Sequence, residues 1–213
     1  MFKKVLILSV LLPLLGLPLK LQADVIHGKE NAIRSIRDNF MARKAEFAID
    51  LDKNTLMKLL DEEDLLNAAA LDDDPADSGD GDYLKANVIS WTASWSVKGP
   101  RANIEFTADY RTSLAQEAQL EQELAASLAA LDMDNATEFK KVKAIHDYII
   151  GLASYDQTLT RYSAYDLFED KAAVCLGYAA AAYRMFTDAG IESRIIAGYA
   201  DFQEHVWNIV KVE

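Results

Sequence analysis

Two side chains of this 213-residue chain, Cys175 and His205, are of the types and spacing that could together do covalent chemistry. A thiolate attacks carbonyl carbons, and a nearby imidazole can take the proton of the thiol and later give it to a leaving amine. Cys175 is the only cysteine in the sequence. An exported protein that keeps one unpaired thiol commonly needs it for chemistry. We therefore interpret Cys175 as a nucleophile and His205 as its base.

The start of the chain supports export. Residues 1–23 have the pattern of a secretory signal peptide, in which Lys3 and Lys4 precede an apolar stretch and Ala23 ends a cleavage-like sequence. A membrane anchor is the alternative, but prolines, a glycine and a lysine interrupt a stretch shorter than the roughly 20 apolar residues of a membrane span. We expect a secreted or cell-envelope protein of a bacterium, without an anchor after cleavage.

The charge of the chain limits its partners. The formal net charge is −12, and removal of residues 1–23, which carry three lysines and no acid, brings it to −15. A strongly acidic protein is repelled by nucleic acid and by anionic lipid, so neither is expected as a partner. One cysteine excludes an internal disulfide. The remaining chain is long enough to bury a core without one.

Residues 24–112 are predicted to form an N-terminal region of strands and helices. Apolar spacing indicates a helix over 31–41, a strand over 46–51 and a helix over 54–70 capped by Asn54. Two further strands, 83–97 and 101–110, are separated by Lys98-Gly99-Pro100, which is typical of a hairpin. Trp91 and Trp95 lie four apart on the first of these strands. We expect them to pack on the core rather than to form a sugar-binding platform.

An acidic segment lies within this region. Residues 61–82 contain ten acidic residues and no basic one, with a proline and two glycines near the end, so residues 72–82 are predicted to be a solvated loop. Calcium binding is the alternative, but no starting position gives the alternating Asp-x-Asp-x-Asp-Gly order of a calcium-binding loop. No metal site is therefore predicted here.

Residues 113–213 are predicted to form a second domain that begins with two helices. The first covers 113–131, and the second, capped by Asn135, carries Val142, Ile145 and Ile149 on one face. His146 borders that face, where a histidine more often packs and forms hydrogen bonds than catalyses a reaction.

Cys175 is predicted to begin a buried helix. Residues 175–188 are rich in alanine and apolar nearly all round, and Gly190 ends the helix. Unpaired N–H groups and the positive end of the helix dipole would stabilise a thiolate and receive an oxyanion at this position. Strands over 191–199 and 205–212 follow, so the cysteine helix faces a sheet that carries His205.

The C-terminal half resembles the transglutaminase-like superfamily, whose papain-like fold packs a cysteine-bearing helix on an antiparallel sheet. The resemblance extends over about Phe139 to Val212, and the cysteine and histidine motifs are its most specific parts. The matching residues are Lys143-Ala144-Ile145-His146-Asp147-Tyr148-Ile149, Tyr155-Asp156, Tyr162-Ser163-Ala164-Tyr165, Ala173-Val174-Cys175-Leu176-Gly177-Tyr178-Ala179, Gly190-Ile191 and His205-Val206-Trp207-Asn208. The resemblance implies that Cys175 is the nucleophile, that His205 is its base, and that acyl transfer proceeds through a thioester.

The family completes its triad with an aspartate on the strand after the histidine strand, and this sequence reaches only Glu213. Asn208 is a poor substitute, since residues three apart on a strand face opposite sides. Glu213 shares the parity of His205 but is too far away along an extended strand. We therefore expect the third residue to lie beyond Glu213 in a longer protein.

The sequence thus predicts an exported α+β protein in which a small strand-and-helix region precedes a transglutaminase-like core. The expected activity is that of a cysteine-dependent acyltransferase or peptidase on protein or peptide amides, by hydrolysis or by transfer to an amine. No cofactor or metal is expected, although some members of the family use calcium. The alternative is a non-catalytic extracellular interaction module that retains the fold.

Overall fold

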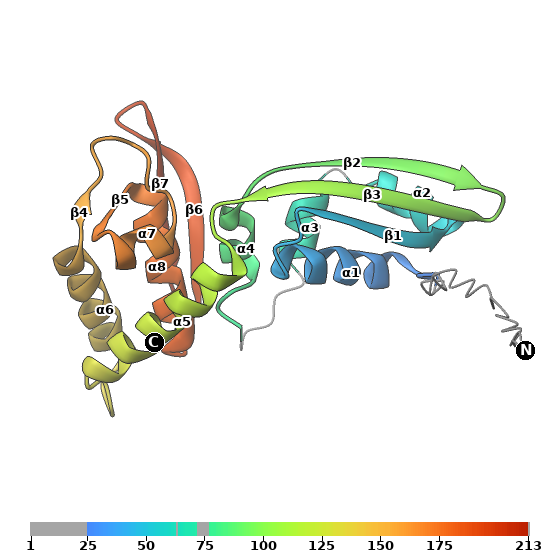
Figure 1. The fold of residues 1–213 in the computed structure, drawn as a ribbon. Coiled ribbons are helices and arrows are strands. Elements are labelled where there is room, and N and C mark those ends of the chain that lie inside the picture. Colours follow the sequence, from blue (N-terminus) through green and yellow to red (C-terminus); the bar gives the residue numbers. More distant parts are fainter. Residues whose placement is uncertain (1–24, 63, 72–76, 213) are drawn as a thin grey trace, which may run out of the picture.

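The computed structural model describes residues 25–62, 64–71 and 77–212, and their helices and strands form two lobes that lie side by side (Figure 1). Each lobe contains its own cluster of buried apolar side chains. We keep the predicted division after residue 112 as the boundary between an N-terminal and a C-terminal lobe. The predicted signal peptide, residues 1–23, and the start of the acidic loop, residues 72–76, lie outside the described residues.

The N-terminal lobe is built on a three-stranded antiparallel sheet of order β1-β3-β2. Its strands are β1 (Glu46–Asp52), β2 (Val88–Lys98) and β3 (Arg101–Tyr110), and its helices are α1 (Lys29–Met41), α2 (Lys53–Leu60), α3 (Leu65–Leu71) and α4 (Gly81–Asn87). Alternate residues of β3, among them Ile104 and Phe106, are buried. They meet Ile36 and Phe40, which lie four apart on one face of α1. The predicted hairpin and first helix are confirmed.

Three predictions for this lobe are wrong in detail. The helix predicted over 54–70 is two helices, α2 and α3, and Asp52 rather than Asn54 caps α2 by accepting hydrogen bonds from the N–H groups of Asn54 and Thr55. The strand predicted to start at Tyr83 starts at Val88, because the preceding residues form α4. Asp82, which was assigned to the acidic loop, lies in the first turn of α4.

The two tryptophans of β2 differ in burial. Trp91 packs against the buried cluster of the lobe, with its ring 6.2 Å from that of Phe106. The side chain of Trp95 is 54% exposed. Packing on the core is therefore confirmed for Trp91 and wrong for Trp95.

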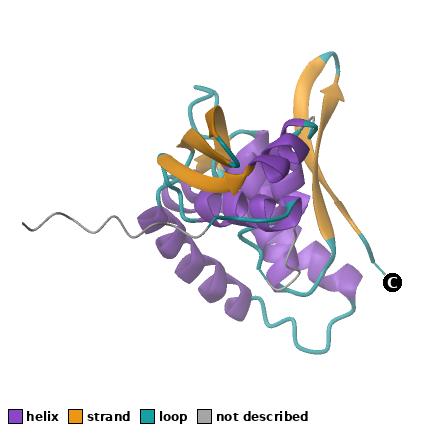
Figure 2. Ribbon diagram, turned by 90° about the vertical axis from the view of Figure 1, so that its right-hand side faces the viewer, coloured by secondary structure: helices purple, strands orange, loops and turns teal. Residues whose placement is uncertain are grey.

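In the C-terminal lobe the other elements pack around a central helix, α8, which lies on an antiparallel pair of strands (Figure 2). The predicted α+β fold class is confirmed. Its elements are α5 (Leu114–Ala130), α6 (Glu138–Leu152), β4 (Ser154–Tyr155), α7 (Ala164–Glu169), β5 (Ala172–Ala173), α8 (Cys175–Asp188), β6 (Ser193–Ala200) and β7 (Gln203–Val210). Within the described part of the chain, no helix is both long and apolar enough to cross a membrane.

Local sequence signals explain where most of these elements begin and end, but the cap of α6 was predicted at the wrong residue. Ser113 and Gln116 form a reciprocal capping box at the start of α5. Thr137, not Asn135, caps α6 by accepting a hydrogen bond from the N–H of Lys140. Asn135 instead has a φ of +60° in the turn before the helix. The β6–β7 hairpin turns through Asp201 and Phe202, both at positive φ.

A buried ionic network joins the two lobes, and Glu117 on α5 is its centre. The Glu117 carboxylate pairs with Arg43, in the turn that follows α1, at 3.2 Å and with Arg184 of α8 at 3.3 Å. Both arginine side chains are at most 5% exposed. The carboxylate also accepts hydrogen bonds from three neutral side chains, those of Tyr83, Asn87 and Thr112. Because both lobes supply donors to one carboxylate, this network fixes α8 relative to the N-terminal sheet.

A second bridge between the lobes connects α4 to the first strand of the C-terminal hairpin. The Asp82 carboxylate accepts two hydrogen bonds from the Arg194 guanidinium, at 2.6 and 2.9 Å, and one from the Ile195 N–H at 2.8 Å. Paired N–H donors on one carboxylate give a well-defined geometry. One residue of the acidic segment thus has a structural role.

We expect Glu117→Ala to lower the free energy of unfolding by about 3 kcal/mol, because it leaves two buried arginines without their shared carboxylate. Chemical denaturation measures this change. Glu123→Ala is the matched control, since Glu123 is exposed on the same helix and should change the free energy by less than about 0.5 kcal/mol. Equal losses in the two variants would contradict a bridging role for Glu117.

Candidate functional site

Cys175 is the first residue of α8, and the helix spans the predicted residues 175–188. Val174 precedes it in an extended conformation, with φ −85° and ψ 176°, so the chain enters the helix abruptly at the cysteine. The Val174 N–H donates to the Arg161 carbonyl oxygen at 2.9 Å, which holds this entry against the preceding loop. The first N–H groups of a helix have no partner within it, so donors lie next to the thiol.

A glycine permits the close packing of this first turn. A Cβ at Gly177 would lie 2.6 Å from the Cβ of Ala173 and 2.9 Å from the carbonyl oxygen of Ser163. Both contacts are shorter than van der Waals distance, so no larger residue fits without movement. Gly177 thus fixes the start of α8 against the segments before α7 and at β5.

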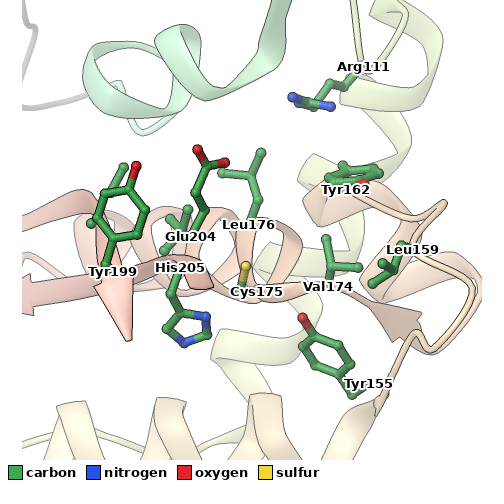
Figure 3. Close-up of a pocket in the computed structure, with 13 residues that line it drawn as sticks. Arg111, Tyr155, Leu159, Tyr162, Val174, Cys175, Leu176, Tyr199, Glu204 and His205 are labelled. Atoms are coloured by element: carbon green, nitrogen blue, oxygen red, sulfur yellow. The ribbon is translucent and has the colours of Figure 1, made fainter. Parts of the chain in front are cut away.

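Cys175 and His205 line one open cavity of about 680 Å³ (Figure 3). The thiol comes from the start of α8 and the imidazole from β7, and both also line a second cavity of about 770 Å³ that extends along α6. Among the described residues, no hydrogen bond joins the Cys175 thiol to the His205 ring. The fold therefore brings the two predicted residues into one cavity without a hydrogen bond between them, and their catalytic roles stay predictions.

The position of His205 follows from the pairing of the hairpin. His205 lies opposite Gly198 of β6, and its ring is 6.2 Å from that of Trp207. A Cβ at Gly198 would lie 2.7 Å from Trp207, so this glycine leaves the space that the indole occupies. The Asn208 amide donates to the Ala179 carbonyl oxygen at 3.0 Å, which agrees with the expectation that it does not orient His205. Glu213 lies outside the described residues.

The loop after β4 is organised around the buried carboxylate of Asp156. One oxygen accepts from the N–H and hydroxyl of Thr158 at 3.0 and 2.6 Å, and the other accepts from the N–H groups of Thr160 and Arg161 at 2.9 and 3.0 Å. These donors, the Thr158 hydroxyl first, hold the pKa of Asp156 well below its usual range. The loop carries Leu159 into the cavity wall beside Cys175.

His146 does not pack as expected. Its side chain is 60% exposed on α6 and its ring is 3.1 Å from the carboxylate of the adjacent Asp147. It lines the second cavity together with Phe139, whose side chain is 65% exposed. The packing prediction failed because, within the described residues, the face of α6 that carries these side chains borders an open cavity.

Two charged residues at the cavity escaped sequence analysis. Glu204 precedes His205 on β7, and Arg111 comes from the N-terminal lobe, between β3 and α5. The Arg111 guanidinium lies over the ring of Tyr162, 5.1 Å from its centroid. Nothing in the local pattern around Arg111 indicates this position, because the other residues of the cavity wall, beginning with Tyr155, are 44 or more residues away in sequence (155 − 111).

Metal ligation gains no support from the described part of the chain, where no three His, Cys, Asp or Glu side chains are grouped to hold an ion. The cavity wall offers one thiol, one imidazole, one carboxylate and one guanidinium. This set suits nucleophilic and acid–base chemistry.

Comparison with known proteins identifies the C-terminal lobe. Residues 122–213 match the model of the transglutaminase-like superfamily. These residues are similar to a transglutaminase-like domain. The match includes Cys175 and His205 and all the elements from α6 onward. The expected fold of a cysteine helix on an antiparallel sheet is therefore confirmed. No curated protein matched the chain.

Solved structures show similar arrangements at low identity. A TGase crystal structure is 14% identical with a TM-score of 0.43, and the match covers 88% of this chain and 56% of that one. A candidate cysteine protease from Cytophaga hutchinsonii is 16% identical with a TM-score of 0.33, covering 59% and 62% of the two chains. A candidate protease from Parabacteroides distasonis is 12% identical with a TM-score of 0.31, covering 78% and 38%. The chain thus spans just over half the length of the TGase.

We expect Gly177→Ala to lower the free energy of unfolding by about 2 kcal/mol, because the added methyl group meets Ala173 and a backbone carbonyl. Gly151→Ala is the matched control, since nothing lies within 4 Å of a Cβ there and the residue is in α6. The free energy of unfolding of Gly151→Ala should rise by about 0.5 kcal/mol, because its unfolded chain has less conformational entropy. Thermal denaturation of both variants tests whether one substitution destabilises the protein and the other stabilises it.

We expect Asp156→Asn to lower the melting temperature by several degrees near neutral pH, because an amide nitrogen would face hydrogen-bond donors. The folded-state pKa of Asp156 is depressed, so its contribution is present above the unfolded pKa and is lost as the pH falls below about 4. The difference in melting temperature between wild type and variant should therefore shrink in acid. A constant difference across pH would show that the carboxylate charge is not involved.

Proposed function

We propose that the transglutaminase-like domain is a cysteine enzyme that cleaves or transfers protein or peptide amides through a thioester on Cys175. The observation that carries this proposal is the shared cavity in which Cys175, at the start of α8, and His205, on β7, both stand. The match to the superfamily over residues 122–213 supports it.

In the first half of the proposed reaction, the Cys175 thiolate attacks the carbonyl carbon of the amide. The carbonyl oxygen becomes an oxyanion, and the first N–H groups of α8 are the nearest helix-terminal donors for it. His205, protonated by the thiol, gives that proton to the leaving nitrogen as the carbon–nitrogen bond breaks. The products are a free amine and a thioester.

In the second half, His205 takes a proton from the group that attacks the thioester. Water gives a carboxylic acid, whereas an amine gives a new amide, and both restore the thiol. The cavity is open to solvent, so water and larger acceptors can both reach it. Hydrolysis and crosslinking therefore differ only in the acceptor.

We place this activity outside the cytoplasm, on a protein or peptide substrate. The signal-like pattern of residues 1–23 supports export, and the net charge of −12 disfavours nucleic acid.

A non-catalytic interaction module is the second candidate, and one observation favours it. Within the described residues, His205 forms no hydrogen bond to Cys175 or to a carboxylate that would orient its ring. An apo enzyme often shows looser catalytic contacts than its substrate complex, so the missing hydrogen bond is compatible with catalysis. Chemical reactivity of the thiol separates the two candidates.

We expect iodoacetamide to alkylate Cys175 of the folded protein faster than in the unfolded chain near neutral pH. His205→Ala should slow this reaction by about tenfold, because the imidazolium that stabilises the thiolate is lost. His27→Ala is the matched control, since this exposed histidine of the N-terminal lobe lines neither cavity and should keep the wild-type rate. Intact-mass spectrometry follows the reaction. Slow alkylation that does not depend on His205 would favour the interaction module.

A further inference from the structure

The cavity at Cys175 has one permanent cation in its wall. Apart from Cys175 and His205, the ionisable groups that line it are Arg111, Glu204 and three tyrosines. An arginine stays protonated at any physiological pH. Arg111 therefore places a fixed positive charge in the cavity that holds the thiol, although the chain as a whole is strongly acidic.

Arg111 is held in place by the N-terminal lobe. Its backbone N–H donates to the Asn87 carbonyl oxygen at 2.9 Å, and its Nε donates to the Ala86 carbonyl oxygen at 2.9 Å. The guanidinium plane is further supported by the ring of Tyr162. The next residue, Thr112, donates to the central carboxylate of Glu117. Arg111 is thus anchored through the same network that positions α8.

The two terminal nitrogens of Arg111 are available to a ligand. Within the described residues no hydrogen bond or ion pair of these two nitrogens is found, whereas Nε is used. Figure 3 shows the guanidinium reaching over the cavity above Leu176, on the side opposite Tyr199 and Glu204. Asp166 lies near enough to act on Arg111 electrostatically, but one of its oxygens accepts from the Ser163 N–H at 2.9 Å.

The guanidinium of Arg111 is partly buried, which is unfavourable for a charged group without an anion beside it. This burial lowers the pKa of Arg111 from its usual value, since the charged form has lost part of its hydration. A planar guanidinium with two free N–H-bearing nitrogens matches the two oxygens of a carboxylate. A carboxylate in the cavity would regain the lost solvation energy.

We infer that Arg111 binds a carboxylate of the substrate, so that the enzyme prefers amides that lie close to an acidic residue of a peptide. This inference rests on the proposed function and adds the substrate class. A carboxylate fits better than a phosphate, because Glu204 faces the same cavity and repels a dianion more strongly than a monoanion. Arg111 would set specificity without taking part in bond breaking.

A matched set of alkylating peptides tests this inference. Chloroacetyl-Glu amide and chloroacetyl-Gly-Glu amide place a carboxylate at two distances from the reactive carbon, and the corresponding Gln peptides carry a neutral side chain of the same shape. Cys175 displaces chloride and forms a thioether with each reagent. The second-order rate constant is measured by intact mass for the full chain.

We expect wild-type protein to react about tenfold faster with the Glu peptide than with its Gln partner at one of the two spacings. Arg111→Gln should bring this ratio to about one, and Arg111→Lys should retain part of it because the charge remains. Arg101→Gln is the matched control, since Arg101 is exposed at the start of β3 and outside the cavity, and it should keep the wild-type ratio.

The outcomes separate this inference from the proposed function. Fast reaction of wild-type protein with iodoacetamide, together with a Glu-to-Gln ratio of one at both spacings, would overturn carboxylate binding and leave the cysteine chemistry intact. A ratio that persists in Arg111→Gln would assign the preference to another residue. Slow reaction with every reagent would overturn both. The wild-type ratio needs no variant, so a folding defect in Arg111→Gln does not prevent the test.

Discussion

The structure depends on the carboxylate of Glu117, which is partly buried between the two lobes. A lone ionised carboxylate is expensive to bury, and so are the two arginines that surround it, but together with neutral donors they satisfy one another. The partners come from the turn after α1, from α4, from α8 and from the segment after β3, so the network can form only when both lobes are folded and docked. The helix that carries the thiol and the segment that carries Arg111 are thus oriented by one charge cluster.

Close packing and local hydrogen bonds also fix the backbone around Cys175. Gly177 lets the first turn of α8 lie against Ala173 and the Ser163 carbonyl, and Asp156 closes the adjoining loop by collecting donors from three residues. The thiol is therefore surrounded by backbone whose position is fixed from two sides. This rigidity suits a nucleophile that must meet a carbonyl carbon at a defined angle.

The sequence predicted elements whose signals are local and missed those that depend on distant contacts. Helix 175–188 was predicted to the residue, because alanines and apolar residues fill it and a glycine, Gly190, follows its end. Tyr83 was placed at the start of the strand predicted over 83–97, but its segment is helical and its ring enters the core of the other lobe. Arg111 could not be predicted as a cavity residue, since only the docking of the lobes brings it to Cys175.

The two reacting groups are mounted very differently. Cys175 starts a helix packed on several sides, whereas His205 lies close to the turn of a two-stranded hairpin whose tip residue, Phe202, is fully exposed. The hairpin joins the lobe at its base, and its tip is exposed to solvent. A small bend of the strands near Ser193 and Val210 would therefore move the imidazole by a larger distance. The distance between thiol and base is therefore an elastic quantity. It is governed by the stiffness of the strands, and anything that presses on the tip changes it.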